Sequence, residues 1–205
     1  AAHKSQQEIA DVYSEKFGVK DNLNTKQLMT VTRKVLNEKY LKADAAITGA
    51  DFIIADTGDI ILSENDGNVL KSVANAGIHI VLVGIDQLIP SIDDINTIIP
   101  LSSIYEVTKI KSKSYCTILS KPAKTKGKQQ KLYVILVDNF RSRIMEHEVQ
   151  RQILTCINCG ACHSVCPVFN TIGGHVYDSA VPGPVGAVLA IAGNPEEGAH
   201  LAPLC

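Results

Sequence analysis

Aromatic residues are scarce in this sequence. The 205-residue chain contains no Trp, and Phe, Trp and Tyr together make up 5% of it. A surface that stacks nucleic-acid bases would have few rings to use. The net charge of -1 also supplies no excess of positive charge for a phosphate backbone. We therefore expect no nucleic-acid partner.

Long apolar runs are missing as well. The longer ones, such as residues 78–85 (IHIVLVGI), fall far short of the roughly 20 residues that a membrane-spanning helix needs. No signal-peptide pattern opens the chain. We expect no membrane span, and we expect the protein in the cytoplasm.

The six cysteines do not have the distribution of a disulfide framework. Cys116 stands alone, and the other five lie within the last 50 residues. A disulfide framework would distribute its cross-links through the chain. The clustering indicates a reducing compartment and a local binding site.

The N-terminal part carries two helix patterns. Ser5 and Glu8 have the spacing of a capping box, and Gly18 marks the end of the first helix. Asn24 and Gln27 repeat the cap at the start of a second helix. Each helix carries an apolar stripe, which is expected to cover a sheet.

The next segment predicts that sheet. Short runs of β-forming residues, separated by Gly and Asp, predict strands at Ala45–Ile47, Phe52–Ala55 and Ile60–Leu62. The continuous apolar run at 78–85 predicts a fully buried strand, and Leu132–Asp138 predicts a strand in the middle of a sheet. Helices that alternate with such strands favour an α/β fold.

Residues 109–131 contain eight lysines. This run is either a surface for an acidic partner or a solvated hairpin, and the hairpin is favoured because Lys runs without Arg are usually solvated. The composition changes again near Met145 to Val149, where we place a domain boundary. The expected division is an α/β domain at residues 1–148 and a second module at 149–205.

Cys156, Cys159, Cys162 and Cys166 form a C-x2-C-x2-C-x3-C-P run. In two-cluster ferredoxins, the first three thiolates of such a run bind one iron-sulfur cluster and the fourth binds the other. The small residue Gly160 lets the backbone approach a cluster. Structural zinc sites also use C-x2-C, but they usually separate two pairs by a dozen or more residues. The spacing favours iron-sulfur chemistry, with zinc as the alternative.

The residues around this run resemble a known family. The stretch CINCGACHSVCPVFNTIGGHVYDSAVPGPVGAVL, at 156–189, is similar to the cluster region of the lactate-utilisation iron-sulfur protein B family. Residues 41–68, 78–91 and 132–144 resemble the LUD domain of that family, in the same order. The resemblance implies a partial LUD domain of the sugar-isomerase and CoA-transferase-like superfamily, followed by an incomplete, mainly helical ferredoxin-type module.

The resemblance also implies a function. Proteins of this family take part in oxidising L-lactate to pyruvate with two partner subunits, and they pass electrons to an acceptor. By this resemblance Cys156, Cys159 and Cys162 would hold one [4Fe-4S] cluster, and Cys166 and Cys205 would belong to a second. Because the family's proteins are more than twice as long, we expect this chain to be an internal fragment that is inactive by itself.

Two loops in the LUD-like segment have two possible roles. The stretches DTGD (56–59) and SENDGN (63–68) are either turns between strands or loops that bind a carboxylate. The absence of a GxGxxG or P-loop pattern favours turns. The residues that carboxylate-binding loops would offer are Thr57, Gly58, Asn65 and Gly67.

An alternative function follows from Glu64. CoA-transferases use a Glu in a Ser-Glu-Asn context as the acyl-accepting nucleophile. The alternative is a transferase-type LUD enzyme that acts on a small carboxylate or acyl substrate, with structural clusters. A surface carboxylate beside a turn is the simpler explanation of Glu64.

Two histidines are candidate proton acceptors for the oxidation of a hydroxyl group. His175 follows a glycine pair near the cysteine run, which makes it the stronger candidate. His79 opens an apolar strand and is expected to cap or pack it. Cys116, in the lysine-rich run, is either a reactive thiol or a buried one.

Overall fold

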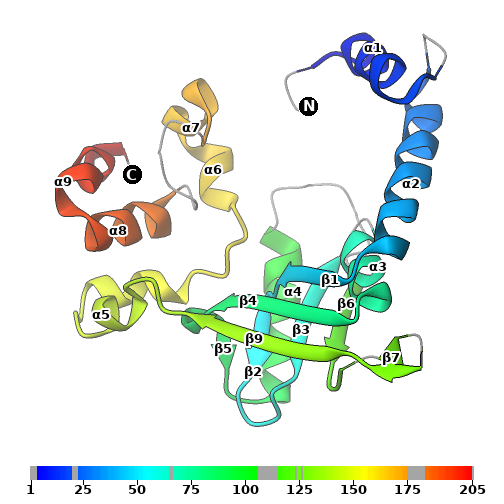
Figure 1. Cartoon of the computed structure of the whole chain (residues 1–205). Helices are drawn as coiled ribbons and strands as arrows, with labels where there is room; N and C mark the ends of the chain where they lie inside the picture. Colours follow the sequence, from blue (N-terminus) through cyan, green and yellow to red (C-terminus); the bar gives the residue numbers. More distant parts are fainter. Residues whose placement is uncertain are drawn as a thin grey trace.

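The chain consists of an α/β part followed by a mainly helical part, as the computed structural model in Figure 1 shows. The structure describes residues 4–19, 23–64, 67–105, 115–122, 124–125, 127–174 and 183–204. None of the helices in these ranges is both long enough and apolar enough to cross a membrane. The fold is mixed α/β and contains a parallel sheet.

The two N-terminal helices, α1 (Gln6–Phe17) and α2 (Thr25–Lys42), begin at the predicted caps. The Ser5 and Asn24 side chains accept hydrogen bonds from the N–H groups of Glu8 and Gln27, respectively. The expectation that both helices cover a sheet is wrong. Helix α1 contacts α2, α2 contacts α3 (Asn68–Asn75), and both extend away from the strands in Figure 1. Their apolar stripes are only partly buried: Leu28 is 7% exposed, whereas Phe17 and Leu41 are 42% and 61% exposed.

Three parallel strands form the first sheet, in the order β1 (Ala45–Gly49), β4 (Ile78–Gly84) and β9 (Lys131–Val137). The strands lie where the sequence predicts them, but β9 is at the edge of the sheet and not in its middle. Residues 133–137 of β9 are 36–52% exposed. Strand β4 is only partly buried, because the side chain of Leu82 is exposed. Apolar composition predicts burial on two faces, whereas the described chain buries only the face that carries Val81 and Val83.

The second sheet has the order β5 (Leu88–Ile89), β2 (Phe52–Ile54), β3 (Ile60–Glu64) and β6 (Tyr115–Leu119). One of its faces packs on the first sheet and the other on α4 (Ile95–Tyr105). The buried residues between the two sheets are Ile53, Ile60, Leu62, Val81 and Val83. Those beneath α4 are Phe52, Ile54, Ile61 and Ile89. This sheet is the centre of a three-layer core.

Part of the lysine-rich run forms a small hairpin. Strands β7 (Lys124–Thr125) and β8 (Lys128–Gln129) pair antiparallel, which confirms the hairpin interpretation for this part of the run. Strand β6 precedes it and pairs antiparallel with β3, which the sequence analysis did not predict. Residues 106–114 lie outside the described residues.

The helical part has two small cores of its own. Ile144, Leu154, Val185 and Leu189 form the first core, and Ala187 packs with Leu201 in the second. Its helices are α5 (Arg141–Met145), α6 (Ala161–Val165), α7 (Pro167–Ile172), α8 (Pro184–Gly193) and α9 (Pro195–Gly198), with 3-10 turns η3 (Gln150–Thr155) and η5 (Ala199–Leu204). Apolar helix α8 contributes to both cores, so it organises this part.

Candidate metal centre

The cysteine run forms a loop and two short helices. Cys156 follows η3, and the backbone then takes left-handed φ values at Asn158 (55°) and Gly160 (71°). Gly160 is the N-cap of α6, which carries Cys162 near its start. Glycine adopts a left-handed φ without steric cost. Gly160 therefore allows the sharp turn that separates Cys159 from Cys162.

Three thiols of the run line one cavity of about 710 Å³. This volume is within the range of roughly 300–1,000 Å³ that is typical of ligand pockets. Desolvation raises the pKa of the Cys162 thiol above its ordinary value, and the charges of Cys156 and Cys159 raise it further. A cationic centre, such as a metal or an iron-sulfur cluster, would offset these effects and favour the thiolate of Cys162.

The three thiols share the cavity without converging on one point. Among the described residues, no three His, Cys, Asp or Glu side chains are close enough together to hold a metal ion. Thiolates are the usual ligands of iron-sulfur clusters. The residues thus fit a cluster by donor chemistry and by available space, and the ligand assignment stays a prediction.

Cys166 occupies a different environment from the other three. It is the N-cap of α7, where Pro167 takes the first helical position, and its Sγ accepts a hydrogen bond from the Phe169 N–H at 3.4 Å. Cys166 is not among the described residues that line the cavity. This separation is compatible with a fourth thiolate that serves another cluster. Cys205, its predicted companion, lies outside the described residues.

His163 was missed by the sequence analysis, although it directly follows Cys162. Its Nε2 is buried and has no hydrogen-bond partner among the described residues, while its ring stacks on Phe169 with 4.4 Å between centroids. A Cβ placed on Gly183 would lie 2.8 Å from this nitrogen and 3.2 Å from the Cys162 Sγ. Buried polar atoms nearly always have a hydrogen-bond partner, so we expect this ring nitrogen to bind one. A cluster sulfur in the cavity would supply it.

An ion pair also lines the cavity. The Arg141 Nε donates to the Asp86 Oδ1 at 2.5 Å, and the two side chains are 14% and 5% exposed. Asp86 lies in the 3-10 turn η1 (Ile85–Gln87) after β4, and Arg141 begins α5. A side chain on Gly84 would collide with Asp86. The pair joins the α/β part to the helical part beside the thiols, and no local sequence signal indicated it.

Comparison with known proteins places the chain in a family. The model of the LUD domain matches residues 1–137. The chain belongs to the LUD-domain family. This match covers the helices α1 and α2 and both sheets, and it ends at the last residue of β9.

Curated relatives of this LUD-domain chain carry a common name. It is 37% identical over 193 residues to "Lactate utilization protein B" of Geobacillus sp. (strain WCH70), and 35% identical over 193 residues to the protein of that name from Bacillus subtilis (strain 168). Each match covers 93% of this chain and 40% of the relative. The chain therefore spans about two fifths of the length of these relatives.

A solved structure is also similar to the chain. The crystal structure of a DUF162 family protein from Deinococcus radiodurans matches 65% of this chain and 84% of its own, with 19% identity and a TM-score of 0.37.

His79 in the LUD part is a packing residue, as the sequence predicts. It is 1% exposed in β4, and its Nε2 shares a hydrogen bond of 2.8 Å with the Thr48 Oγ1 of β1. Burial lowers the pKa of His79 from 6.5. A ring enclosed in this way has no access to a substrate.

The DTGD stretch is a turn, which confirms the favoured interpretation. The Gly58 N–H donates to the Ile54 carbonyl at 2.8 Å, and the Asp59 N–H donates to the Thr57 Oγ1 at 3.3 Å. Gly58 has a φ of 74°, which a Gly accepts readily. Both N–H groups are thus used inside the turn that connects β2 to β3, and they are not directed to a ligand.

Other candidates lie partly or wholly outside the described residues. Glu64 ends β3 and pairs with Tyr115, and Cys116 pairs with Ser63, but the side chains of Glu64 and Cys116 are not described. Asn65 and His175 are outside the description entirely. Their proposed roles therefore remain predictions.

Proposed function

We propose that this chain is part of an iron-sulfur electron-transfer subunit that serves the oxidation of L-lactate to pyruvate. The observation that carries the proposal is the single cavity lined by the thiols of Cys156, Cys159 and Cys162. Membership of the LUD-domain family and the name shared by the curated relatives support the link to lactate. Two partner subunits, an electron acceptor and a cytoplasmic location belong to the same proposal.

The residues of the chain have separate roles in this proposal. Cys156, Cys159 and Cys162 hold one [4Fe-4S] cluster, and Cys166 and Cys205 contribute to a second. When bound, such clusters accept and release single electrons.

The residues around the thiols shape the environment of the clusters. His163 offers a buried ring nitrogen to acceptors in the cavity, and Gly183 leaves room beside Cys162. The pair of Arg141 and Asp86 fixes one wall of the cavity.

The ligand assignment is tested by reconstitution of the natural full-length protein without oxygen. Iron and acid-labile sulfide are measured in the wild type, in Cys159→Ser and in the matched control Cys116→Ser. We expect Cys159→Ser to lose about four irons per chain, because one cluster loses a ligand. Cys116→Ser should keep the full content, since Cys116 lies in the LUD part.

Two results would overturn the assignment. One is stoichiometric zinc in place of iron and sulfide, which would indicate a structural zinc site. The other is an equal loss of iron in the Cys159→Ser and Cys116→Ser variants. In the complex with its partner subunits, Cys159→Ser should also abolish electron transfer from L-lactate while circular dichroism reports a folded protein.

The transferase alternative is tested on the same complex. Glu64→Gln removes the proposed nucleophile and keeps the size of the side chain. We expect L-lactate oxidation to continue at the wild-type rate in this variant. Loss of all activity, with the iron content unchanged, would favour the transferase.

A further inference from the structure

A second, smaller cavity lies between α5 and α8 and has a volume of about 270 Å³. It shares no described lining residue with the cysteine cavity. Ligand pockets for drug-sized molecules usually measure roughly 300–1,000 Å³. This cavity is therefore suited to a molecule of a few non-hydrogen atoms.

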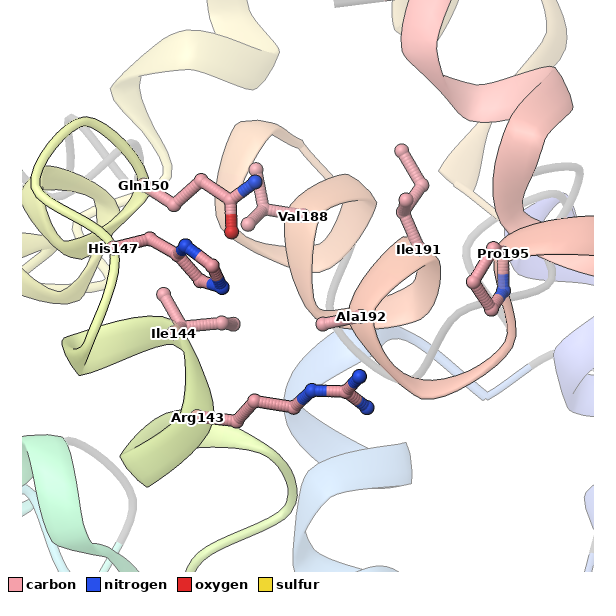
Figure 2. A pocket seen from close by; sticks show the side chains of 8 residues that line it. All are labelled: Arg143, Ile144, His147, Gln150, Val188, Ile191, Ala192 and Pro195. Carbon is pink, nitrogen blue, oxygen red and sulfur yellow. The ribbon is translucent and has the colours of Figure 1, made fainter.

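The two walls of this cavity differ in chemistry. One wall carries Arg143, His147 and Gln150, whose side chains reach from α5 and the following segment towards α8 in Figure 2. The remaining lining residues are apolar: Ile144, Val188, Ile191, Ala192 and Pro195. No Asp or Glu is among the described residues that line the cavity. The α5 side therefore offers hydrogen-bond donors on both sides of Ile144, and the α8 side is apolar.

The polar side chains of this cavity have unused hydrogen-bonding groups. Within the described chain, no hydrogen bond or ion pair engages the side chains of Arg143, His147 or Gln150. Arg141, two residues before Arg143, is by contrast fixed by Asp86. A guanidinium has a planar fork of donors that matches a carboxylate. All three side chains are exposed, so an anion that binds here would displace water and not a protein partner.

We infer that the cavity between α5 and α8 binds a small carboxylate, with Arg143 as its charge partner. His147 and Gln150 supply further hydrogen bonds to the carboxylate, and Val188 and Ala192 contact the apolar end of the ligand. The polar side chains are solvent-exposed, so the dissociation constant should be on the order of millimolar. The inference is independent of the clusters and of lactate oxidation.

Equilibrium dialysis of the full chain with carbon-14-labelled propionate tests the inference. We expect saturable binding of one propionate per chain, about tenfold weaker in Arg143→Ala. Arg143→Lys should bind with intermediate affinity, because Lys keeps the charge without the fork. Arg151→Ala is the matched control, since Arg151 is exposed nearby without lining the cavity, and it should bind as the wild type does.

The apolar wall is tested separately. Ala192→Leu fills part of the cavity and should weaken propionate binding, whereas unlabelled L-lactate should compete and inorganic phosphate should compete poorly. Equal binding by Arg143→Ala and Arg151→Ala would overturn the inference. So would competition by phosphate as strong as that by lactate, or propionate binding that does not saturate. Far-ultraviolet circular dichroism confirms that each variant is folded.

Discussion

The α/β part and the helical part differ in the elements that carry their cores. Ile54, Ile60 and Ile61 are 0% exposed between the layers of the α/β part. In the helical part, Ile144 and Leu201 are also nearly fully buried, at 1% exposure each, but the helices α5, α6 and α9 have only four or five residues each. Helices this short are not stable by themselves.

This difference shows how each part is stabilised. The α/β core joins strands far apart in the sequence, and its burial needs no bound group. The helical part combines two small cores with thiols that open on a cavity. We therefore expect the α/β part to remain folded when the cysteines are replaced, and the helical part to gain order from metal binding.

The largest expected loss of stability comes from a substitution in the α/β core. Ile60→Ala removes a fully buried side chain between the two sheets, and should lower the free energy of unfolding by about 2–5 kcal/mol. Ile47→Ala in β1 is the control, because Ile47 is 67% exposed and should change stability by about 0.5 kcal/mol or less. Urea unfolding followed by circular dichroism measures both variants. Similar losses would contradict the three-layer core.

A smaller effect is expected in the helical part. Leu201 is 1% exposed and packs against Ala187. Leu201→Ala should lower the free energy of unfolding by about 2 kcal/mol, which is at the low end for a buried Leu because this core is small. Hydrogen exchange should rise in α8 and η5 and stay unchanged in β4. Val149→Ala, at a residue that is 79% exposed, should leave both regions unaffected. Faster exchange in β4 would show that the two parts unfold together.

The contact between the two parts gives the next effect. Asp86→Asn removes the charge that pairs with Arg141, and should cost about 1–3 kcal/mol because the guanidinium stays mostly buried. Asp93→Asn, at an exposed carboxylate after η1, should be nearly neutral. Urea unfolding compares the two variants. If neither variant changes the free energy of unfolding, the ion pair does not stabilise the contact between the α/β and helical parts.

The smallest effect concerns pH and is confined to the α/β part. Burial lowers the folded pKa of His79, so below the ordinary value of 6.5 the unfolded chain binds a proton that the folded chain excludes. The stability contribution of neutral His79 is complete above pH 6.5 and is lost as the pH falls towards the lowered pKa. The loss is at most about 1.4 kcal/mol per pH unit.

His79→Gln isolates this contribution. Gln keeps a hydrogen-bonding group for Thr48 and does not titrate. Between pH 7 and 5, the free energy of unfolding should fall less steeply in the variant than in the wild type. Identical slopes would mean that other groups determine the pH dependence.

Local signals predicted most elements of the fold. The caps at Ser5 and Asn24 act over three residues, and they place α1 and α2 correctly. Strands β1 to β4 and β9 follow from short apolar runs, with bounds that differ by one or two residues. Strand β6 was missed because its residues lie within the lysine-rich run, and its identity depends on pairing with β3.

The environment of the strands could not be predicted in the same way. An apolar run such as 132–137 shows that a segment favours burial, and it does not show which neighbours cover it. The edge position of β9 depends on the strand order of the whole sheet.

The sequence by itself determined the thiol arrangement of this protein: the spacing of Cys156, Cys159, Cys162 and Cys166, and the glycine that turns the loop between them. These features lie within 11 residues, so covalent connection alone keeps them together. The tertiary structure decided which side chains surround them. Asp86 and Arg141 are 55 residues apart, and Thr48 and His79 are 31 apart. Such contacts form only when strands and helices pack, because no local pattern records the partner of a side chain.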